Sequence, residues 1–81
     1  MIKVKLKCFS QVKYALGTGE VILEIEIGAT TAELEEMVRD RADGRLDGVG
    51  LSVAINQQYV KGDVVLHDGD EVVLIPPVQG G

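Results

Sequence analysis

The sequence predicts a small two-layer α+β domain, in which one main helix covers one face of a sheet of four or five strands. Several stretches alternate apolar and polar residues with the period of two that is typical of half-buried strands. Residues 30–44 instead space their apolar side chains as a helix does. The chain has 81 residues, 46% of them hydrophobic, which is enough for one core and one domain.

The first strand is predicted over residues 2–8, where apolar residues alternate with lysines. Its inward residues are expected to be Ile2, Val4, Leu6 and Cys8. A short helix is expected over residues 10–17, with Ser10 as its N-cap and Gly17 as its end. Val12 and Leu16 would share the buried face of that helix.

The second strand is predicted over residues 20–27. Its expected core residues are Val21, Leu23, Ile25 and Ile27. Glu24 and Glu26 would face outward and could oppose Lys3, Lys5 and Lys7 if the first two strands pair. Such exposed pairs contribute only about 0.2–1 kcal/mol each, but they help to set the register of the strands.

The main helix is predicted to begin at a capping box, because Thr30 and Glu33 have the T-x-x-E spacing. Its apolar stripe consists of Leu34, Met37, Val38 and Ala42. Acidic residues occupy its first turns, whereas Arg39 and Arg41 come later, which suits the helix dipole. Gly44 is the expected end of the helix.

The second half of the chain is predicted to supply the remaining strands, after a loop over residues 45–50. One strand would place Leu51, Val53 and Ile55 inward, and a short return segment would follow a turn at 56–58. Asp68 and Gly69 form a strong turn signal before the last strand, residues 71–75.

That last strand has four apolar residues in succession, which leaves two interpretations open. Either both of its faces are covered, or one apolar face is exposed and Val73 and Ile75 form a surface for a partner.

Composition and charge argue against several classes of function. The net charge is −5, which disfavours nucleic acid as a partner, because phosphate binding depends on clustered Lys and Arg. A single cysteine, Cys8, excludes an internal disulfide, and its inward position favours a structural thiol over a nucleophile. The lone histidine, His67, is expected to be a solvated loop residue. No stretch has the roughly 20 apolar residues that a membrane span needs, so we expect a cytoplasmic protein without a membrane or metal partner.

The most informative segment follows the last strand. We expect residues 1–75 to form the domain and residues 76–81 to form an extended tail. The tail consists of Pro76, Pro77, Val78, Gln79, Gly80 and Gly81. The two prolines cannot continue a strand ladder and favour an extended exit, and the two glycines could pass through a narrow slot in a partner. Chain ends are usually frayed, so a terminal Gly-Gly alone would not indicate a function. Here Gly-Gly directly follows a Pro-Pro pair and a strand, and this combination favours a functional tail.

This arrangement would present one chemical group, the α-carboxylate of Gly81, at the end of an extended tail. A carboxylate at neutral pH is unreactive until another enzyme activates it, for example as an acyl-adenylate. Attack by a sulfide equivalent would then give a thiocarboxylate, and attack by a lysine would attach the chain to a target. Neither route needs catalytic side chains in this chain.

The whole chain resembles the ubiquitin-like β-grasp sulfur carriers, and most closely the small subunits of molybdopterin synthase. The stretches that carry the resemblance are "KCFSQVKYALGTGE", "LSVAINQQYV" and "LHDGDEVVLIPPVQGG". The resemblance implies a β-grasp fold with a mixed four- to five-stranded sheet. Family members often have Ser or Ala where this chain has Gln79, so a partner's channel would need more room there, or Gln79 would face solvent.

The resemblance also implies the partners. A ubiquitin-activating-type adenylyltransferase would use ATP and Mg²⁺ to adenylate Gly81, and a sulfurtransferase would supply the sulfur. The tail would then enter the large subunit of molybdopterin synthase and deliver sulfur to cyclic pyranopterin monophosphate, in a heterotetramer. This chain would bind no cofactor and would be a non-catalytic subunit. Sulfur delivery for thiamin or tRNA thiolation, conjugation to lysines as a protein modifier, and a purely structural interaction domain are the alternatives.

Overall fold

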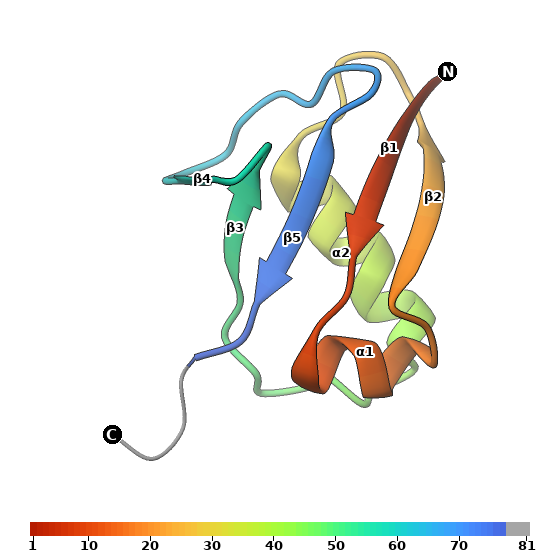
Figure 1. The fold of residues 1–81 in the computed structure, drawn as a ribbon, viewed down its shortest axis with the longest axis vertical. Helices are drawn as coiled ribbons and strands as arrows, with labels where there is room; N and C mark the ends of the chain where they lie inside the picture. Colours follow the sequence, from red (N-terminus) through yellow and green to blue (C-terminus); the bar gives the residue numbers. More distant parts are fainter. Residues whose placement is uncertain (78–81) are drawn as a thin grey trace.

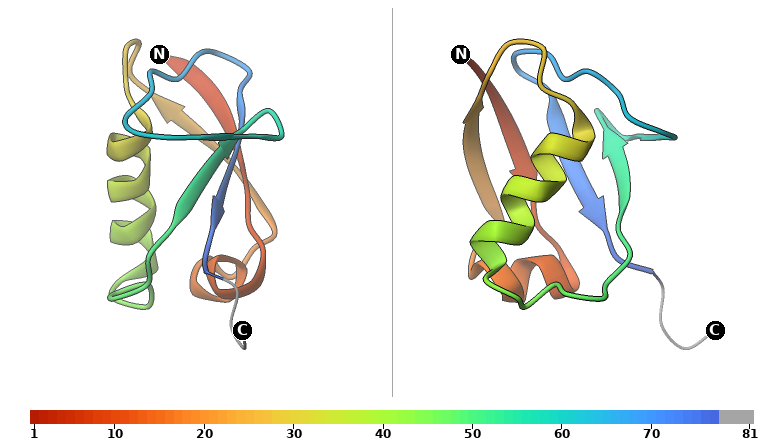
Figure 2. Two further views of the ribbon diagram at one scale, coloured as in Figure 1. Left: turned by 90° about the vertical axis from the view of Figure 1, so that its left-hand side faces the viewer. Right: turned by 180° about the vertical axis from the view of Figure 1, so that it is seen from behind.

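The computed structural model describes residues 1–77 and confirms the two-layer α+β architecture. In chain order its elements are β1 (Ile2–Lys7), α1 (Ser10–Leu16), β2 (Glu20–Ile25), α2 (Thr31–Ala42), β3 (Ser52–Ile55), β4 (Gln58–Val60) and β5 (Glu71–Ile75). The strands form one five-stranded sheet in the order β2-β1-β5-β3-β4. Helix α2 crosses one face of the sheet, and α1 lies at the end toward which β1 and β5 run (Figure 1, Figure 2).

The sheet is mixed, because β5 pairs with β1 in parallel while the other neighbours are antiparallel. The predicted pairing of the first two strands is confirmed, and Lys3 lies opposite Glu24. The predicted inward position of Ile27 is wrong: Ile27 is 80% exposed. Strand β2 ends at Ile25 and the chain turns through Gly28, whose φ is +90°, so that Ala29 enters the core instead.

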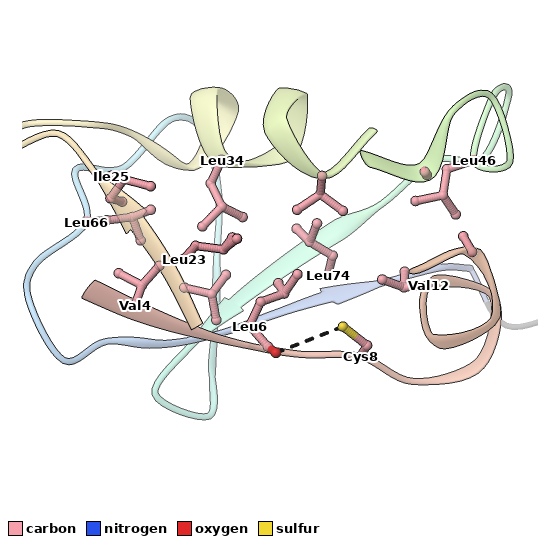
Figure 3. Packing of buried hydrophobic residues seen from close by; sticks show 14 of the residues in the cluster. Val4, Leu6, Cys8, Val12, Leu23, Ile25, Leu34, Leu46, Leu66 and Leu74 are labelled. Carbon is pink, nitrogen blue, oxygen red and sulfur yellow. Dashed lines mark hydrogen bonds between the residues drawn. The ribbon is translucent and has the colours of Figure 1, made fainter. Parts of the chain in front are cut away.

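The core lies between α2 and the inner face of the sheet (Figure 3). Its largest fully buried side chains are Leu6, Leu23, Leu34, Leu46, Leu66, Leu74, Val4, Val12, Val38, Val72 and Cys8. The helical stripe predicted for α2 is confirmed, with Leu34, Val38 and Ala42 buried and Met37 packed against them. Each fully buried Leu or Val contributes about 1.5–3 kcal/mol relative to exposure, so this cluster is the main source of stability.

The ends of the two helices only partly match the prediction. In α2 the Thr30 side chain accepts a hydrogen bond from the Glu33 N–H at 3.4 Å, as expected for an N-cap. That helix ends at Ala42, and Asp43, in the left-handed region, is the C-cap in place of Gly44. In α1 the Ser10 N-cap is wrong: Phe9 has the extended backbone of an N-cap, and the φ of Ser10 is +52°.

Strand β3 packs as predicted, since Leu51, Val53 and Ile55 are partly buried against the core. Strand β4 starts at Gln58, so the connecting turn has only two residues, Asn56 and Gln57. Both have positive φ, at +50° and +71°, which is the backbone of a tight hairpin turn.

Candidate functional site

The predicted tail leaves the sheet at the end of β5, which lies between β1 and β3 (Figure 1). Val72 and Leu74 are fully buried against the core. Val73 and Ile75 lie on the opposite face of the sheet, away from α2, and are half-buried. Of the two interpretations of the last strand, the one with a partly exposed apolar face therefore matches the structure. Contact of Val73 and Ile75 with a partner stays a prediction.

An apolar hollow of about 420 Å³ lies where the chain leaves β5. It is lined by Phe9, Ser10, Gln11, Val73, Leu74, Ile75, Pro76 and Pro77. Phe9 is 56% exposed, although it is a large apolar residue at the junction of β1 and α1. Phe9 was not predicted from the sequence as a site residue. The available signal was a large aromatic residue in the connection between a strand and a helix, where it does not belong to the apolar period of either element.

The Pro-Pro segment begins directly after the strand. Pro76 is half-buried and Pro77 is exposed, and neither belongs to a strand. The predicted tail residues Val78, Gln79, Gly80 and Gly81 lie outside the residues that the structure describes.

The Asp68-Gly69-Asp70 motif holds the beginning of β5 in place. The Asp70 carboxylate accepts hydrogen bonds from the His67 N–H at 2.8 Å and from the Asn56 side-chain amide at 3.0 Å. The Asp70 carbonyl accepts a third, from the Lys5 N–H at 2.9 Å. Asp70 therefore links the turn before β5 to both neighbouring strands, β1 and the end of β3.

Asp68 and Asn56 complete this arrangement. The Asp68 carboxylate accepts from the Lys3 N–H at 2.8 Å, and the Gly69 N–H donates to the Lys3 carbonyl at 2.8 Å. The Asn56 side chain accepts from the Glu71 N–H at 3.0 Å, while the Asn56 N–H donates to the Glu71 carbonyl at 2.8 Å. The Asp68-Gly69-Asp70 motif therefore has a structural role, because it holds the strand that precedes Pro76 and Pro77.

A second polar cluster fixes the N-terminal end of α2. The Asp63 carboxylate accepts hydrogen bonds from the Ala32 N–H at 2.9 Å and from the Thr31 hydroxyl at 3.2 Å. The backbone hydrogen bond from Ala32, followed by the threonine hydroxyls, lowers the pKa of Asp63. The Val64 N–H in turn donates to the Thr31 hydroxyl at 3.1 Å, so the segment before β5 is tied to the main helix.

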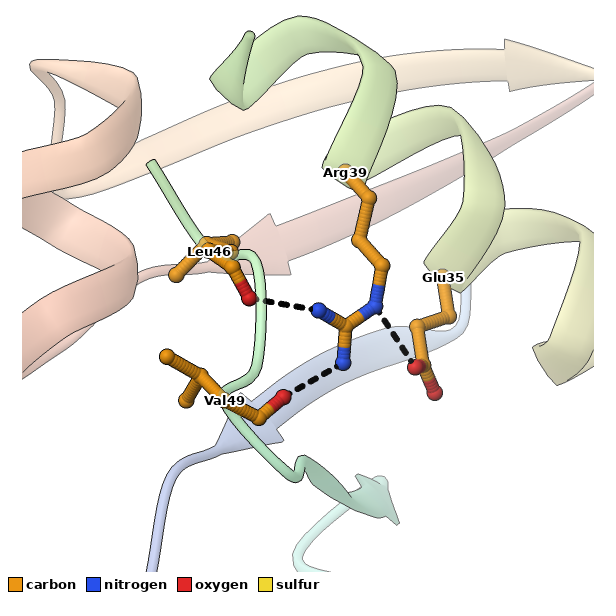
Figure 4. A network of polar contacts seen from close by, with 4 residues as sticks. All are labelled: Glu35, Arg39, Leu46 and Val49. Atoms are coloured by element: carbon orange, nitrogen blue, oxygen red, sulfur yellow. Dashed lines mark hydrogen bonds and ion pairs between the residues drawn. The ribbon is translucent and has the colours of Figure 1, made fainter. Parts of the chain in front are cut away.

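Arg39 fixes the loop between α2 and β3 (Figure 4). Its guanidinium donates to the Glu35 carboxylate at 3.0 Å, to the Leu46 carbonyl at 2.7 Å and to the Val49 carbonyl at 2.6 Å. The Leu46 carbonyl also accepts from the Val49 N–H at 3.0 Å, so Arg39 reinforces the turn that follows the buried Leu46. The role of Arg39 is structural.

Side-chain chemistry in residues 1–77 gives no candidate catalytic centre of its own. Cys8 is 1% exposed, and burial raises the pKa of its thiol, which disfavours the reactive thiolate. Within the same residues no group of three or more His, Cys, Asp or Glu side chains could hold a metal ion. No helix in this part of the chain is long and apolar enough to cross a membrane.

The mixed sheet, the helix across one face and the central strand that leads into Pro-Pro define a ubiquitin-like β-grasp domain. The chain belongs to the ThiS family, whose model matches residues 6–81. It is 35% identical over 80 residues to the molybdopterin synthase sulfur carrier subunit of Escherichia coli, covering 96% of this chain and 99% of the relative. The subunit of the same name from Chlamydomonas reinhardtii is 34% identical over 84 residues, covering 99% of this chain and all of the relative.

Solved structures agree with this assignment. A Pyrococcus furiosus protein, whose structure carries the name molybdopterin converting factor subunit 1, has a TM-score of 0.85 and 32% identity over 96% of this chain and all of its own. The fold is shared at lower identity with small archaeal modifier protein SAMP1 of Haloferax volcanii (TM-score 0.81, 21% identity, 98% of this chain and 99% of that one). It is also shared with a Helicobacter pylori chain solved in a complex of subunits 1 and 2 of molybdopterin-converting factor (TM-score 0.69, 23% identity, 99% of this chain and all of that one).

Proposed function

We propose that this chain is the sulfur carrier of a molybdopterin synthase and that its working group is the C-terminal carboxylate of Gly81. The observation that carries the proposal is the placement of β5, which is hydrogen-bonded on both sides and followed at once by Pro76 and Pro77. Pro76 and Pro77 cannot continue a strand ladder, so the sheet ends at Ile75 and the fixed strand leads directly into the proposed tail. The full-length similarity to named sulfur carrier subunits supports the same conclusion.

The proposed chemistry has two steps before the sulfur is donated. An adenylyltransferase of the ubiquitin-activating type, with ATP and Mg²⁺, lets the Gly81 carboxylate attack the α-phosphorus of ATP, and pyrophosphate leaves. A sulfide equivalent from a sulfurtransferase then attacks the acyl carbon, and AMP leaves, which yields a thiocarboxylate. Glycine suits this role because it has no side chain to hinder the acyl carbon.

The acceptor in this proposal is cyclic pyranopterin monophosphate, bound in the large subunit of molybdopterin synthase. The tail residues Pro76, Pro77, Val78, Gln79 and Gly80 would pass into that subunit, and its side chains would supply the acids and bases. The Helicobacter pylori complex of subunits 1 and 2 supports a partner of this kind, and we infer a heterotetramer of two carriers and two large subunits.

The apolar face next to the tail is the proposed docking surface for the large subunit. Val73 and Ile75 are half-buried, Phe9 is 56% exposed, and together they border the hollow beside Pro76. Apolar side chains that stay accessible beside a functional segment are typical of an interface. This surface would also set the depth to which the tail is inserted.

A second candidate function is conjugation to lysines as a protein modifier, through the same activated Gly81. SAMP1, a small archaeal modifier protein, has the same fold as this chain, so the fold is compatible with this alternative. The two are separated by mass spectrometry of the protein purified from its own cells. A gain of about 16 Da in the intact mass marks the exchange of oxygen for sulfur, whereas Gly-Gly remnants on target lysines mark conjugation.

The decisive test adds one alanine after Gly81. We expect the extended chain to form no thiocarboxylate with the purified activating enzyme and sulfur donor, because the terminal carboxylate has moved. Its unfolding temperature should stay within about 1 °C of the original, since residues at a chain terminus usually contribute little to stability. The control carries the same alanine before Met1 and should be charged normally. Sulfur transfer by the extended chain, with its extra residue still in place, would overturn the proposal.

A further inference from the structure

Strand β2 forms one edge of the sheet and has a strand neighbour on one side only. Its six residues, Glu20–Ile25, pair with β1, and no described strand lies beyond it (Figure 1). The outer edge of such a strand presents backbone N–H and C=O groups that can pair with another chain. No proline and no bulge interrupts the ladder from Ile2↔Ile25 to Lys7↔Glu20.

Two hollows lie beside this edge, between β2 and the helices. One, of about 220 Å³, is lined mainly by apolar side chains, including Ile25, Leu34 and Met37. The other, of about 350 Å³, lies at the start of the strand and includes Val21 and Arg41. Figure 2 shows α2 running diagonally across the sheet toward the start of β2. Both hollows include residues of β2 and of α2, so they lie beside the edge strand. The inward side chains of an added strand would meet mainly apolar surface in the first hollow, and Leu16 and Val21 beside Thr18 and Arg41 in the second.

The charges on the outer face of the sheet alternate from strand to strand. Glu71 of β5 lies 3.6 Å from Lys7 of β1, and Lys7 lies opposite Glu20 of β2. Lys3 of β1 lies opposite Glu24 of β2 in the same way. A strand added beyond β2 would continue this alternation only if its side chains on the outer face were cationic. Opposite charges across neighbouring strands stabilise pairing, and like charges disfavour it.

The same glutamates disfavour a second copy of this chain at the edge. In a symmetric antiparallel pairing centred on Ile22, Glu20 of each copy would face Glu24 of the other. The apolar hollow is also bordered by Glu26 and Glu33, which adds negative charge on that side. The occupant that matches the charge is therefore basic.

We propose that the outer edge of β2 and the groove between β2 and α2 bind an extended segment of another protein. In this segment Lys or Arg alternates with branched apolar residues. Its backbone would add a sixth strand, its cations would face Glu20 and Glu24, and its apolar side chains would enter the two hollows. Strand β1 already has this pattern on the other side of β2, as "IKVKLK". The proposal goes beyond sulfur carriage and does not depend on it, because β1 separates this edge from β5 and the tail exit.

The test uses the full chain and a blocked, fluorescein-labelled peptide of eight residues in which lysine and valine alternate. We expect saturable binding by fluorescence anisotropy, with NMR amide shifts concentrated in residues 20–25. An analogue with glutamate in place of lysine should not bind. Glu24→Lys should weaken binding about five- to tenfold, because one favourable cross-strand pair becomes a repulsive one.

Asp47→Lys is the matched control, since it makes the same change of charge at an exposed position in the loop between α2 and β3 that lines neither hollow, and it should leave the affinity unchanged. Glu24→Gln provides a neutral variant if the added lysine unfolds the strand, and it should weaken binding about threefold. Three results would overturn the proposal: no saturation at millimolar peptide, equal affinity for the acidic analogue, or amide shifts centred on Val73 and Ile75. Unchanged affinity in a folded Glu24 variant would do the same.

Discussion

Replacing Asp70 by alanine should weaken the fold at the strand that leads to the tail. The change removes two hydrogen bonds accepted by the carboxylate, from the His67 N–H at 2.8 Å and the Asn56 side-chain amide at 3.0 Å. Hydrogen bonds to charged groups contribute about 1.5–3 kcal/mol each. Both donors here belong to exposed residues and can bind water instead, so we take about 1 kcal/mol for each bond and about 2 kcal/mol in total.

The assay is thermal and urea unfolding followed by circular dichroism. A loss of about 2 kcal/mol corresponds to a fall of roughly 8–16 °C in the unfolding temperature of a domain of this size. Asp70→Asn retains one acceptor oxygen but not the charge, and it should lose about half as much.

The control is Asp47→Ala, at an exposed position in the loop after α2, which should change stability by less than about 0.5 kcal/mol. A loss below about 0.5 kcal/mol for Asp70→Ala, or an equal loss for Asp47→Ala, would refute the idea that Asp70 anchors β5.

Four further predictions follow from other parts of the structure. Gln57→Gly should stabilise the protein by about 0.5–1 kcal/mol in urea unfolding, because Gln57 has a φ of +71° that glycine adopts without strain; no gain would contradict this. Asp63→Asn should flatten the acid limb of the stability–pH curve. The lowered pKa of Asp63 contributes stability above the usual aspartate pKa of about 3.9, and this stability is lost as the pH falls through the pKa of the folded protein. An unchanged acid limb would count against a stabilising role for the hydrogen bonds from Ala32 and Thr31 to Asp63. Cys8 should react with a thiol reagent only after unfolding, since it is 1% exposed and burial raises its pKa; fast labelling of the native protein would disprove its burial. Val73→Asp should reduce affinity for the proposed partner, a molybdopterin synthase large subunit, at least tenfold in calorimetry while leaving the core intact, and unchanged affinity would remove this residue from the proposed docking surface.

The sequence predicted the elements whose side chains follow a clear period. The alternation in β1 and the capping pattern at Thr30 gave the correct strand and helix, because burial of one face imposes the spacing directly. Ile27 was misplaced because alternation alone does not show where a strand ends. Gly28 turns the chain toward α2, and the apolar pattern continues past the last paired residue.

Core residues that lie in loops show no periodic pattern in the sequence. Leu46 and Leu66 are fully buried, yet both lie in irregular segments without a helical or strand period, and only the fold brings them to the core. The network of Arg39 with the Leu46 and Val49 carbonyls could not be predicted either, because it depends on the path of a loop.

The candidate site was predicted in part. Val73 and Ile75 were expected on an apolar face, and the structure places them on the side away from α2. Phe9 joins them only because β1 and β5 run side by side and in parallel, a pairing of distant segments that local patterns do not contain. The structural role of the Asp68-Gly69-Asp70 motif was likewise hidden, since its partners Lys3, Lys5 and Asn56 are far away in the chain.

The central position of β5 has a consequence for biosynthesis. Because β5 is the last of the described strands to be translated but lies between β1 and β3, a nascent chain without it has two separate strand pairs and no continuous sheet. Such a chain cannot complete its core while residues 71–75 are still inside the ribosome. Prematurely terminated products that lack β5 should therefore remain open to cellular proteases, whereas chains that include residues 71–75 can complete the sheet and its core.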